Sequence, residues 1–185
     1  MNINWVLADD AVINPGVSLK ALKNVGSFWG SWKTWRAYST DNVICYDPVK
    51  ADELVKKSLQ GACNFYLSKT VHEQLGKPAG IRLYDGDFLG HEVDNQDEII
   101  AMHLSSSICD IVLLVGFAWV DREFTDTADQ ERYDTYINLV YNAVKSCPDV
   151  QWILLDHPGQ LHSKMTHLDN LTTDTLVNVM RLLST

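Results

Sequence analysis

Two apolar segments decide the fold, DIVLLVGF at residues 110–117 and VQWILL at residues 150–155. Each is a nearly continuous hydrophobic run of strand length, which is typical of parallel strands that are covered on both faces. A helix is predicted between them, over residues 128–146. The succession of strand, helix and strand predicts a parallel pair at the centre of an α/β sheet.

The rest of the chain continues this alternation. Further strands are predicted at residues 3–8, 42–46 and 80–84, and further helices at residues 17–37, 48–60, 63–75, 94–107 and 171–183. For residues 17–37 a second alternative stays open, in which Gly26 or Gly30 interrupts the helix and a helix begins near Ser31 after a loop. We therefore expect a Rossmann-like three-layer α/β sandwich with about five mainly parallel strands, built by residues 1–185 as a single domain. Ligands of such sheets bind at the carboxyl ends of the strands.

Composition narrows the function classes. The 185 residues are 46% hydrophobic and 21% charged, as in a globular protein, and the net charge of −9 disfavours a nucleic-acid-binding surface. No apolar run approaches the about 18 residues of a membrane span. The first ten residues lack the basic start of a signal peptide, and the cysteines form no C-x-x-C pair, so we expect reduced thiols and a cytoplasmic protein. A homo-oligomer stays open.

Acidic residues follow several predicted strands. Asp9 and Asp10 follow the first strand, and Asp85 and Asp87 follow the strand at residues 80–84. Carboxylates that converge at one sheet edge would suit Mg²⁺, which prefers oxygen ligands and accompanies phosphates. Alternatively, these residues cap helices and stabilise turns. Asp47 before Pro48 has the pattern of a helix N-cap, and it is also included among the candidate ligand-binding residues.

Histidines cluster after the segment at residues 150–155, in DHPGQLHSKMTH. A loop that contains proline and glycine does not require these side chains to converge on zinc. His157, directly at the predicted sheet edge, is the preferred candidate for acid–base chemistry.

Three tryptophans crowd the segment GSFWGSWKTWRAYSTDNVICYD at residues 26–47. On a helix, Trp29, Trp32 and Trp35 would form one stripe, which predicts core positions for Trp32 and Trp35 and leaves Trp29 open between core and ligand site. Lys33 and Arg36 lie beside this stripe and are the candidates for binding a phosphate.

Complete catalytic and nucleotide-binding motifs are absent from the sequence. It contains no phosphate loop of the G-x-x-x-x-G-K-[ST] type, no G-x-G-x-x-G after the first strand and no G-x-S-x-G elbow. A phosphoacceptor receiver domain needs a lysine after its fifth strand, where this chain has Asp156 and His157.

Residues 103–155 begin HLSSSICDIVLLVGFAWVD and continue through TADQERYD to VQWILL. This segment resembles the second half of nucleoside 2-deoxyribosyltransferase-like and TIR-like domains, in which an apolar central strand is followed by an acidic loop and a helix with the catalytic glutamate. The resemblance implies that Glu131 is the catalytic carboxylate and that Asp126 or Asp129 contacts a ribose or base. The chain departs from that pattern in lacking small residues before Glu131 and a glycine-rich first loop. Alternatively, Glu131 belongs with Asp129 and Asp134 to the solvated first turn of a long helix, where acidic residues are stabilising without any catalytic role.

Two functions follow from these patterns. One is an enzyme, a hydrolase or transferase, acting on a nucleotide, nucleoside or phosphorylated metabolite at the carboxyl edge of the sheet. The other is a non-catalytic module that binds a nucleotide or a protein partner. Carboxylates gathered after strands favour the first, and the absence of a complete catalytic motif favours the second.

Overall fold

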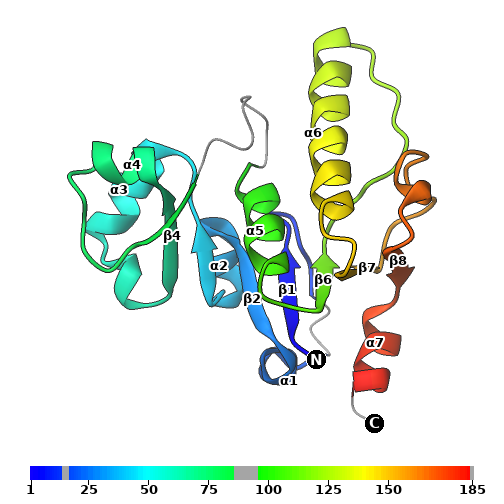
Figure 1. Cartoon of the computed structure of the whole chain (residues 1–185), viewed down its shortest axis with the longest axis horizontal. Helices are drawn as coiled ribbons and strands as arrows, with labels where there is room; N and C mark the ends of the chain where they lie inside the picture. Colours follow the sequence, from blue (N-terminus) through cyan, green and yellow to red (C-terminus); the bar gives the residue numbers. More distant parts are fainter. Residues whose placement is uncertain (14–16, 86–95, 184–185) are drawn as a thin grey trace.

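The computed structural model describes residues 1–13, 17–85 and 96–183, and within them the chain forms one parallel sheet. The strands are β1 (Ile3–Leu7), β2 (Ser27–Ser31), β3 (Asn42–Ile44), β4 (Asn64–Ser68), β5 (Arg82–Tyr84), β6 (Ile111–Val115), β7 (Gln151–Leu155) and β8 (Leu171–Asp174). Their order is β5-β4-β3-β2-β1-β6-β7-β8 (Figure 1). The predicted α/β fold is confirmed, with more strands than expected. β6 and β7 form a parallel pair inside the sheet as predicted, although β7 lies next to the edge strand β8 and not at the centre.

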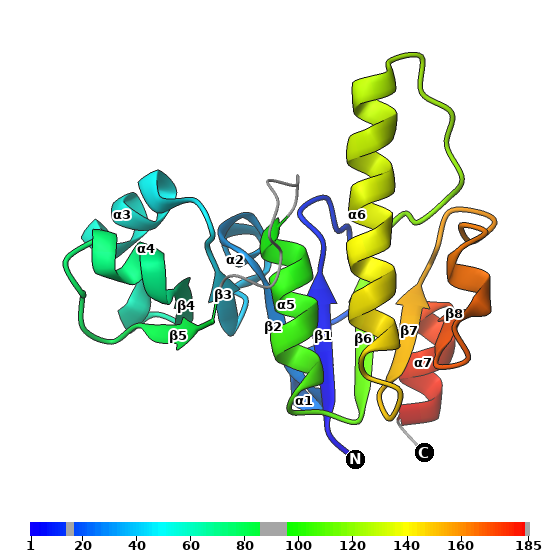
Figure 2. The same cartoon turned by 45° about the horizontal axis from the view of Figure 1, so that its top comes forward.

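Helices cover both faces of this sheet (Figure 2). They are α1 (Leu19–Val25), α2 (Trp32–Tyr38), α3 (Pro48–Lys56), α4 (Lys69–Gln74), α5 (Gln96–Ser106), α6 (Thr127–Lys145) and α7 (Leu176–Leu183), with short 3-10 turns at Leu59–Gly61 and Met165–His167. One face packs under α5 and α6, where Val6, Leu114 and Trp152 meet Ile100 and Val140. These interior strand residues are almost fully buried.

The opposite face has two hydrophobic clusters, because alternate side chains of each strand point to opposite sides. Trp5 and Phe28 pack there with α1 and α7. Further along the sheet, Val43 and Phe65 pack with α2, α3 and α4. Asp47 caps α3 as predicted, since its Oδ1 accepts hydrogen bonds from the amides of Val49 and Lys50.

Three predicted helices were wrong in the same way, because each contains a short strand. Residues 17–37 form α1, β2 and α2; residues 63–75 begin with β4; and residues 171–183 begin with β8. Each strand is only four or five residues long and runs directly or almost directly into the helix that follows. A window of helical length averages such a strand with its helix, so the change of period is lost.

The tryptophan segment shows the consequence. Trp29 lies on β2 and is buried at 2% exposure on the face covered by α5 and α6. Trp32 and Trp35 lie on α2 and pack, partly buried, on the opposite face. One helical stripe of all three tryptophans was therefore wrong, and the alternative of a helix that begins near Ser31 is confirmed, because α2 starts at Trp32 with Ser31 as its N-cap. Trp32 and Trp35 pack against the core as predicted, although they are only partly buried.

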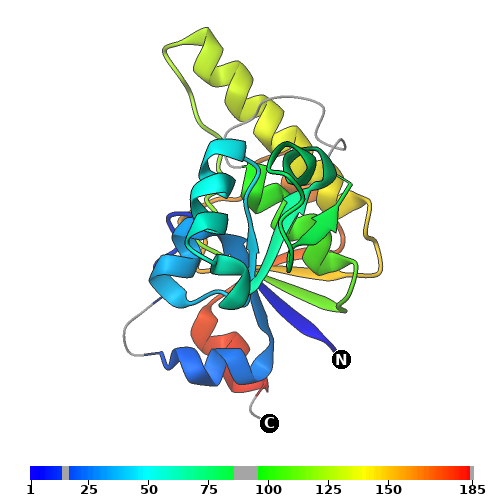
Figure 3. The ribbon, with the colours of Figure 1, turned by 90° about the vertical axis from the view of Figure 1, so that its left-hand side faces the viewer.

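The order of the strands reverses between β1 and β6. The chain proceeds from β1 outward to β5, and α5 then returns it to β6 on the other side of β1. Helix α6 extends well past this edge of the sheet (Figure 3). None of the helices in the described ranges is both long and apolar enough to cross a membrane. A parallel sheet binds its ligands at such a reversal, so the space beyond β1 and β6 is where a site is expected.

Candidate functional site

A cavity of about 320 Å³ lies beyond the carboxyl ends of β1 and β6. It is lined by residues that follow the two strands and by residues of α5, α6 and the loop before α6: Ala8, Asp10, Glu98, Gly116, Phe117, Ala118, Arg122, Phe124, Asp129, Arg132, Tyr133 and Tyr136. The volume is at the lower end of the range for small-molecule sites. The cavity therefore occupies the position that the strand order predicts.

Gly116 allows the two strand ends to approach closely. Its φ of +84° lies in the left-handed region, and a Cβ at this position would come within 2.5 Å of the Ala11 Cα. The Ala8 amide donates to the carbonyl of Val115 at 2.9 Å, just before this point. Glycine is needed here for both its backbone conformation and its lack of a side chain.

Glu98 is a buried carboxyl group at the start of α5. Its side chain lines the cavity, yet the residue is only 3% exposed. Glu98 Oε1 accepts a hydrogen bond from the Asp9 amide at 2.6 Å. The Tyr136 hydroxyl, which accepts a hydrogen bond from Trp119 Nε1 at 3.2 Å, lines the same cavity as Glu98. The Asp9 amide thus orients the Glu98 carboxyl group from the end of β1.

The surroundings of Glu98 favour its neutral form. Burial raises its pKa to about 8, the Asp9 amide opposes this rise, and the Asp9 and Asp10 carboxylates add to it. Burial likewise raises the pKa of the adjacent Asp97 to about 7, although the Tyr46 amide donates to Asp97 Oδ1 at 2.7 Å. A carboxyl group that titrates near neutral pH is suited to general acid–base chemistry.

The Asp9 carboxylate contacts a basic group and a hydroxyl group, while the Asp9 amide contacts Glu98. Its Oδ2 lies 2.7 Å from Lys33 Nζ, and its Oδ1 accepts a hydrogen bond from the Ser31 hydroxyl. The hydrogen bond to Asp9 raises the pKa of Lys33, and the charges of Asp10 and Glu98 act in the same direction. Lys33, a predicted phosphate contact, therefore lies at the right edge of the sheet but neutralises a carboxylate there.

The outer wall of the cavity combines arginines with aromatic rings. The Arg122 guanidinium lies 5.2 Å from the centre of the Tyr133 ring, and the Phe124 and Tyr133 ring centres are 5.4 Å apart. Arg132 Nη1 is 3.6 Å from Asp129 Oδ1, in an exposed ion pair. Guanidinium groups bind phosphate through paired hydrogen bonds, and aromatic faces stack on planar rings.

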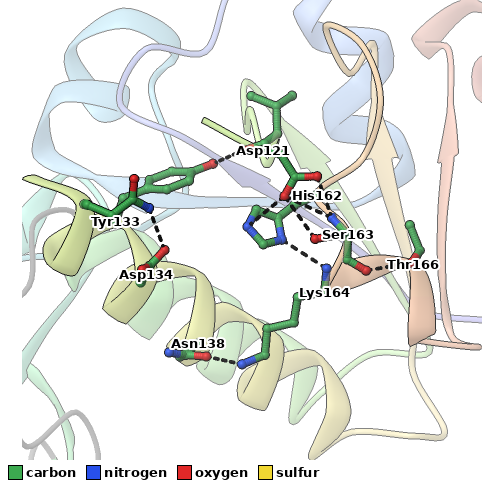
Figure 4. Close-up of polar contacts among 10 residues, drawn as sticks. Asp121, Tyr133, Asp134, Asn138, His162, Ser163, Lys164 and Thr166 are labelled. Carbon is green, nitrogen blue, oxygen red and sulfur yellow. Dashed lines mark hydrogen bonds and ion pairs between the residues drawn. The ribbon is translucent and has the colours of Figure 1, made fainter. Parts of the chain in front are cut away.

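Contacts among three residues, Asp121, His162 and Ser163, hold the loop between β6 and α6 (Figure 4). We call this set of contacts the interlock. Asp121 Oδ1 accepts a hydrogen bond from the Ser163 hydroxyl at 3.0 Å, and Asp121 Oδ2 accepts one from the Ser163 amide at 3.2 Å. His162 Nε2 lies 3.3 Å from Asp121 Oδ1. The interlock joins the loop after β6 to the loop after β7.

The other predicted ligand-binding residues lie away from the cavity. The Trp29 side chain belongs to the core, and Asp47 caps α3. The Arg36 guanidinium lies 5.8 Å from the centre of the Trp32 ring, within its own helix. These positions give each residue a structural role.

The two predicted catalytic residues are not brought together. Glu131 is exposed on α6 and does not line the cavity, although Asp129 and Arg132 on the same helix do. Asp126, the other residue named by the resemblance, is the N-cap of α6. His157 lies beyond β7, where its Nδ1 is 3.0 Å from the Gly159 carbonyl oxygen, in a separate hollow with Asp156 and Asp174.

The predicted metal ligands are divided between distant strands. Asp9 and Asp10 follow β1, whereas Asp85 follows the edge strand β5 and pairs with Lys69. Three strands separate β1 from β5. Asp87 lies outside the described residues. Among the residues that are described, no group of three or more His, Cys, Asp or Glu side chains could hold a metal ion.

Sequence reasoning missed Glu98, Tyr136 and both arginines of the cavity. Glu98 had the pattern of a helix-dipole partner, because acidic residues are common in a first helical turn. The signal that could have identified it is topological: the helix that returns the chain across β1 begins at the reversal of strand order. Arg122 and Arg132 flank the start of α6, which follows the last strand at that reversal.

Comparison with known proteins found no relative of this chain. No protein-family model, curated protein or solved structure matches the chain.

Proposed function

We propose that the protein binds a nucleotide or another phosphorylated metabolite in the cavity at β1 and β6, and that Glu98 is the acid–base group of a reaction on that ligand. The observation that carries the proposal is a buried, oriented carboxyl group that opens on the same cavity as two arginines. A cavity, convergent polar groups and a shifted pKa together are a stronger indication than any one alone.

The charges of the cavity support an anionic ligand. When Glu98 is protonated, the two positive charges of Arg122 and Arg132 equal the two negative charges of Asp10 and Asp129. The lining of the cavity then has no net negative charge to repel a phosphate. The ion pair of Arg132 with Asp129 is exposed and therefore weak, so that a phosphate can replace the carboxylate as its partner. Charge-assisted bonds between arginine and phosphate are among the strongest in proteins.

The aromatic residues support a planar group on the ligand. Phe117, Phe124 and Tyr133 line the cavity next to Arg122. A nucleobase stacked on one of these rings would leave its phosphate within reach of the guanidinium groups. The protonated carboxyl group of Glu98 would donate a hydrogen bond to a ligand atom in the ground state and release its proton to that atom as negative charge develops there.

The proposal is tested by thermal shift with nucleoside 5′-monophosphates, ribose 5-phosphate and the matching unphosphorylated compounds. Of the predicted metal ligands that are described, Asp10 alone lines the cavity, so each assay is run with and without Mg²⁺. A phosphorylated ligand at about a hundred times its Kd should raise the Tm by about 5 °C or more.

Matched arginine variants locate the binding site. Arg122→Gln and Arg132→Gln should each weaken binding about tenfold or more, whereas Arg82→Gln, on the edge strand β5, should not. Stabilisation by no phosphorylated compound, or equal binding by all three variants, would contradict the proposal. Conversion of the bound compound that is lost in Glu98→Gln identifies an enzyme; binding without conversion identifies the non-catalytic module.

A further inference from the structure

The two sides of the loop between β6 and α6 make different contacts. Arg122 and Phe124 line the cavity, whereas Asp121 contacts the loop that follows β7 (Figure 4). Arginine is long and has about 2 kcal/mol of rotamer entropy, so its affinity for a phosphate depends on how firmly its backbone is placed. The position of Arg122 is therefore set by whatever holds its neighbours.

Hydrogen bonds to the backbone carbonyls of Trp119 and Val120 hold the segment just before Arg122. The His162 amide donates to the Trp119 carbonyl at 2.6 Å, and the Tyr133 hydroxyl of α6 donates to the Val120 carbonyl at 2.7 Å. The Tyr133 and His162 ring centres lie 6.3 Å apart, so α6 and the loop after β7 meet across this segment. Three consecutive residues before Arg122 are thus anchored to other parts of the fold.

Asp121 contributes the side-chain part of this anchorage. Its carboxylate receives the Ser163 amide and hydroxyl and approaches the His162 ring, although 62% of its side chain is exposed. The Asp121 carboxylate contacts three donors from one loop and therefore orients that loop. It contributes little to the stability of the whole protein, because water competes for each of these exposed hydrogen bonds. Its removal is expected to loosen the loop and leave the core intact.

We propose that Asp121 is a positioning residue that, through the interlock with His162 and Ser163, holds Arg122 in place for the phosphate of the ligand. This inference rests on the proposed function, because it assigns a phosphate contact to Arg122. It adds that the affinity for phosphate depends on a carboxylate outside the cavity. The nucleoside part of the ligand, which Arg122 does not touch, should depend on Asp121 less than the phosphate does.

The experiment measures Kd by calorimetry for adenosine 5′-monophosphate and for adenosine. Asp121→Ala should weaken binding of the monophosphate about tenfold and binding of adenosine much less, with the Tm within about 2 °C of wild type. Asp121→Asn retains an acceptor for Ser163 and should restore most of the affinity. Asp52→Ala removes an exposed carboxylate paired with Lys56 on α3 and serves as the matched control.

A double-mutant cycle separates this inference from the proposed function. If Asp121 acts through Arg122, adding Asp121→Ala to Arg122→Gln should cause no further loss of affinity. Additive losses, or full affinity in Asp121→Ala while Arg122→Gln is impaired, would overturn the inference and leave the proposed function standing. An equal loss for adenosine would show a general structural effect and overturn it too. If wild type binds neither these probes nor any phosphorylated compound of the thermal-shift series, the proposed function fails, and the inference fails with it.

Discussion

Carboxylates at two places along the same edge of the sheet behave in opposite ways. At the reversal between β1 and β6, Glu98 is buried, hydrogen-bonded to the Asp9 amide and surrounded by other acidic groups. At the outer end of the sheet, beyond β5, Asp85 is 85% exposed and pairs with Lys69 in water. The two positions belong to one parallel sheet, but interior strands, α5 and α6 cover the first.

The difference shows that burial, more than residue type, gives a carboxyl group its chemistry. A desolvated carboxylate loses the hydration that stabilises its charge, and its pKa rises; an exposed one keeps that hydration. The outer region, which we define as β4, α4 and β5, therefore supplies matched controls for the reversal: the same substitution should have a large effect at one place and a small one at the other.

The largest expected effect is that of Glu98→Gln on the pH dependence of stability. The folded-state pKa of about 8 lies above the ordinary value of 4.5, so the folded protein binds more protons than the unfolded chain between these pH values. The contribution of Glu98 to the free energy of unfolding is then fully present below pH 4.5, decreases as pH rises, and levels off above pH 8. The decrease attributable to Glu98 should be on the order of 4 kcal/mol between pH 5 and pH 8.

Urea unfolding at several pH values measures this decrease for wild type and Glu98→Gln. The variant, whose amide cannot ionise, should lose the part of the slope due to Glu98 and keep the part due to Asp97, which also has a raised pKa. Glu73→Gln makes the same chemical change on α4, where the carboxylate is exposed and 3.8 Å from Lys77 Nζ, and should leave the slope as in wild type. Parallel slopes in all three proteins would show that Glu98 is ionised in the folded state.

The next effect concerns two glycines with the same backbone conformation. Gly116→Ala should destabilise the protein by about 3 kcal/mol, because a φ of +84° disfavours alanine and its Cβ would meet the Ala11 backbone. Gly76→Ala, after α4, has a φ of +77° and open space around its Cβ, and should cost about 1 kcal/mol. Chemical unfolding compares the two, and equal losses would show that the close approach at Gly116 is relieved without cost.

The smallest effect is expected for Asp85→Asn. The exposed ion pair with Lys69 contributes little, and Asp85 lies three intervening strands away from Asp9 and Asp10. The Tm of wild type and of the variant should therefore agree, and any effect of Mg²⁺ should be the same for both. Stabilisation by Mg²⁺ that disappears in Asp85→Asn would mean that the separated carboxylates come together to bind the ion.

The sequence predicted the parts of the fold that depend on one segment at a time. The runs at residues 110–117 and 150–155 are apolar almost throughout, so their place inside a parallel sheet follows from composition. The cap at Asp47 depends on Pro48 and the next turn, and it formed as predicted. Prediction failed for β2, β4 and β8, because each short strand is followed closely by a helix and the two periods merge.

The site was predicted less well, because its residues are distant in sequence. The sequence by itself determined a parallel α/β sheet, an edge where strand ends meet, and acidic residues such as Asp10 at that edge. Only the tertiary structure decided that β1 lies beside β6, that α5 returns across them, and that Glu98 is buried against the Asp9 amide and Tyr136. The physical reason is that hydrophobic periodicity acts within an element, whereas desolvation depends on which elements pack around a side chain.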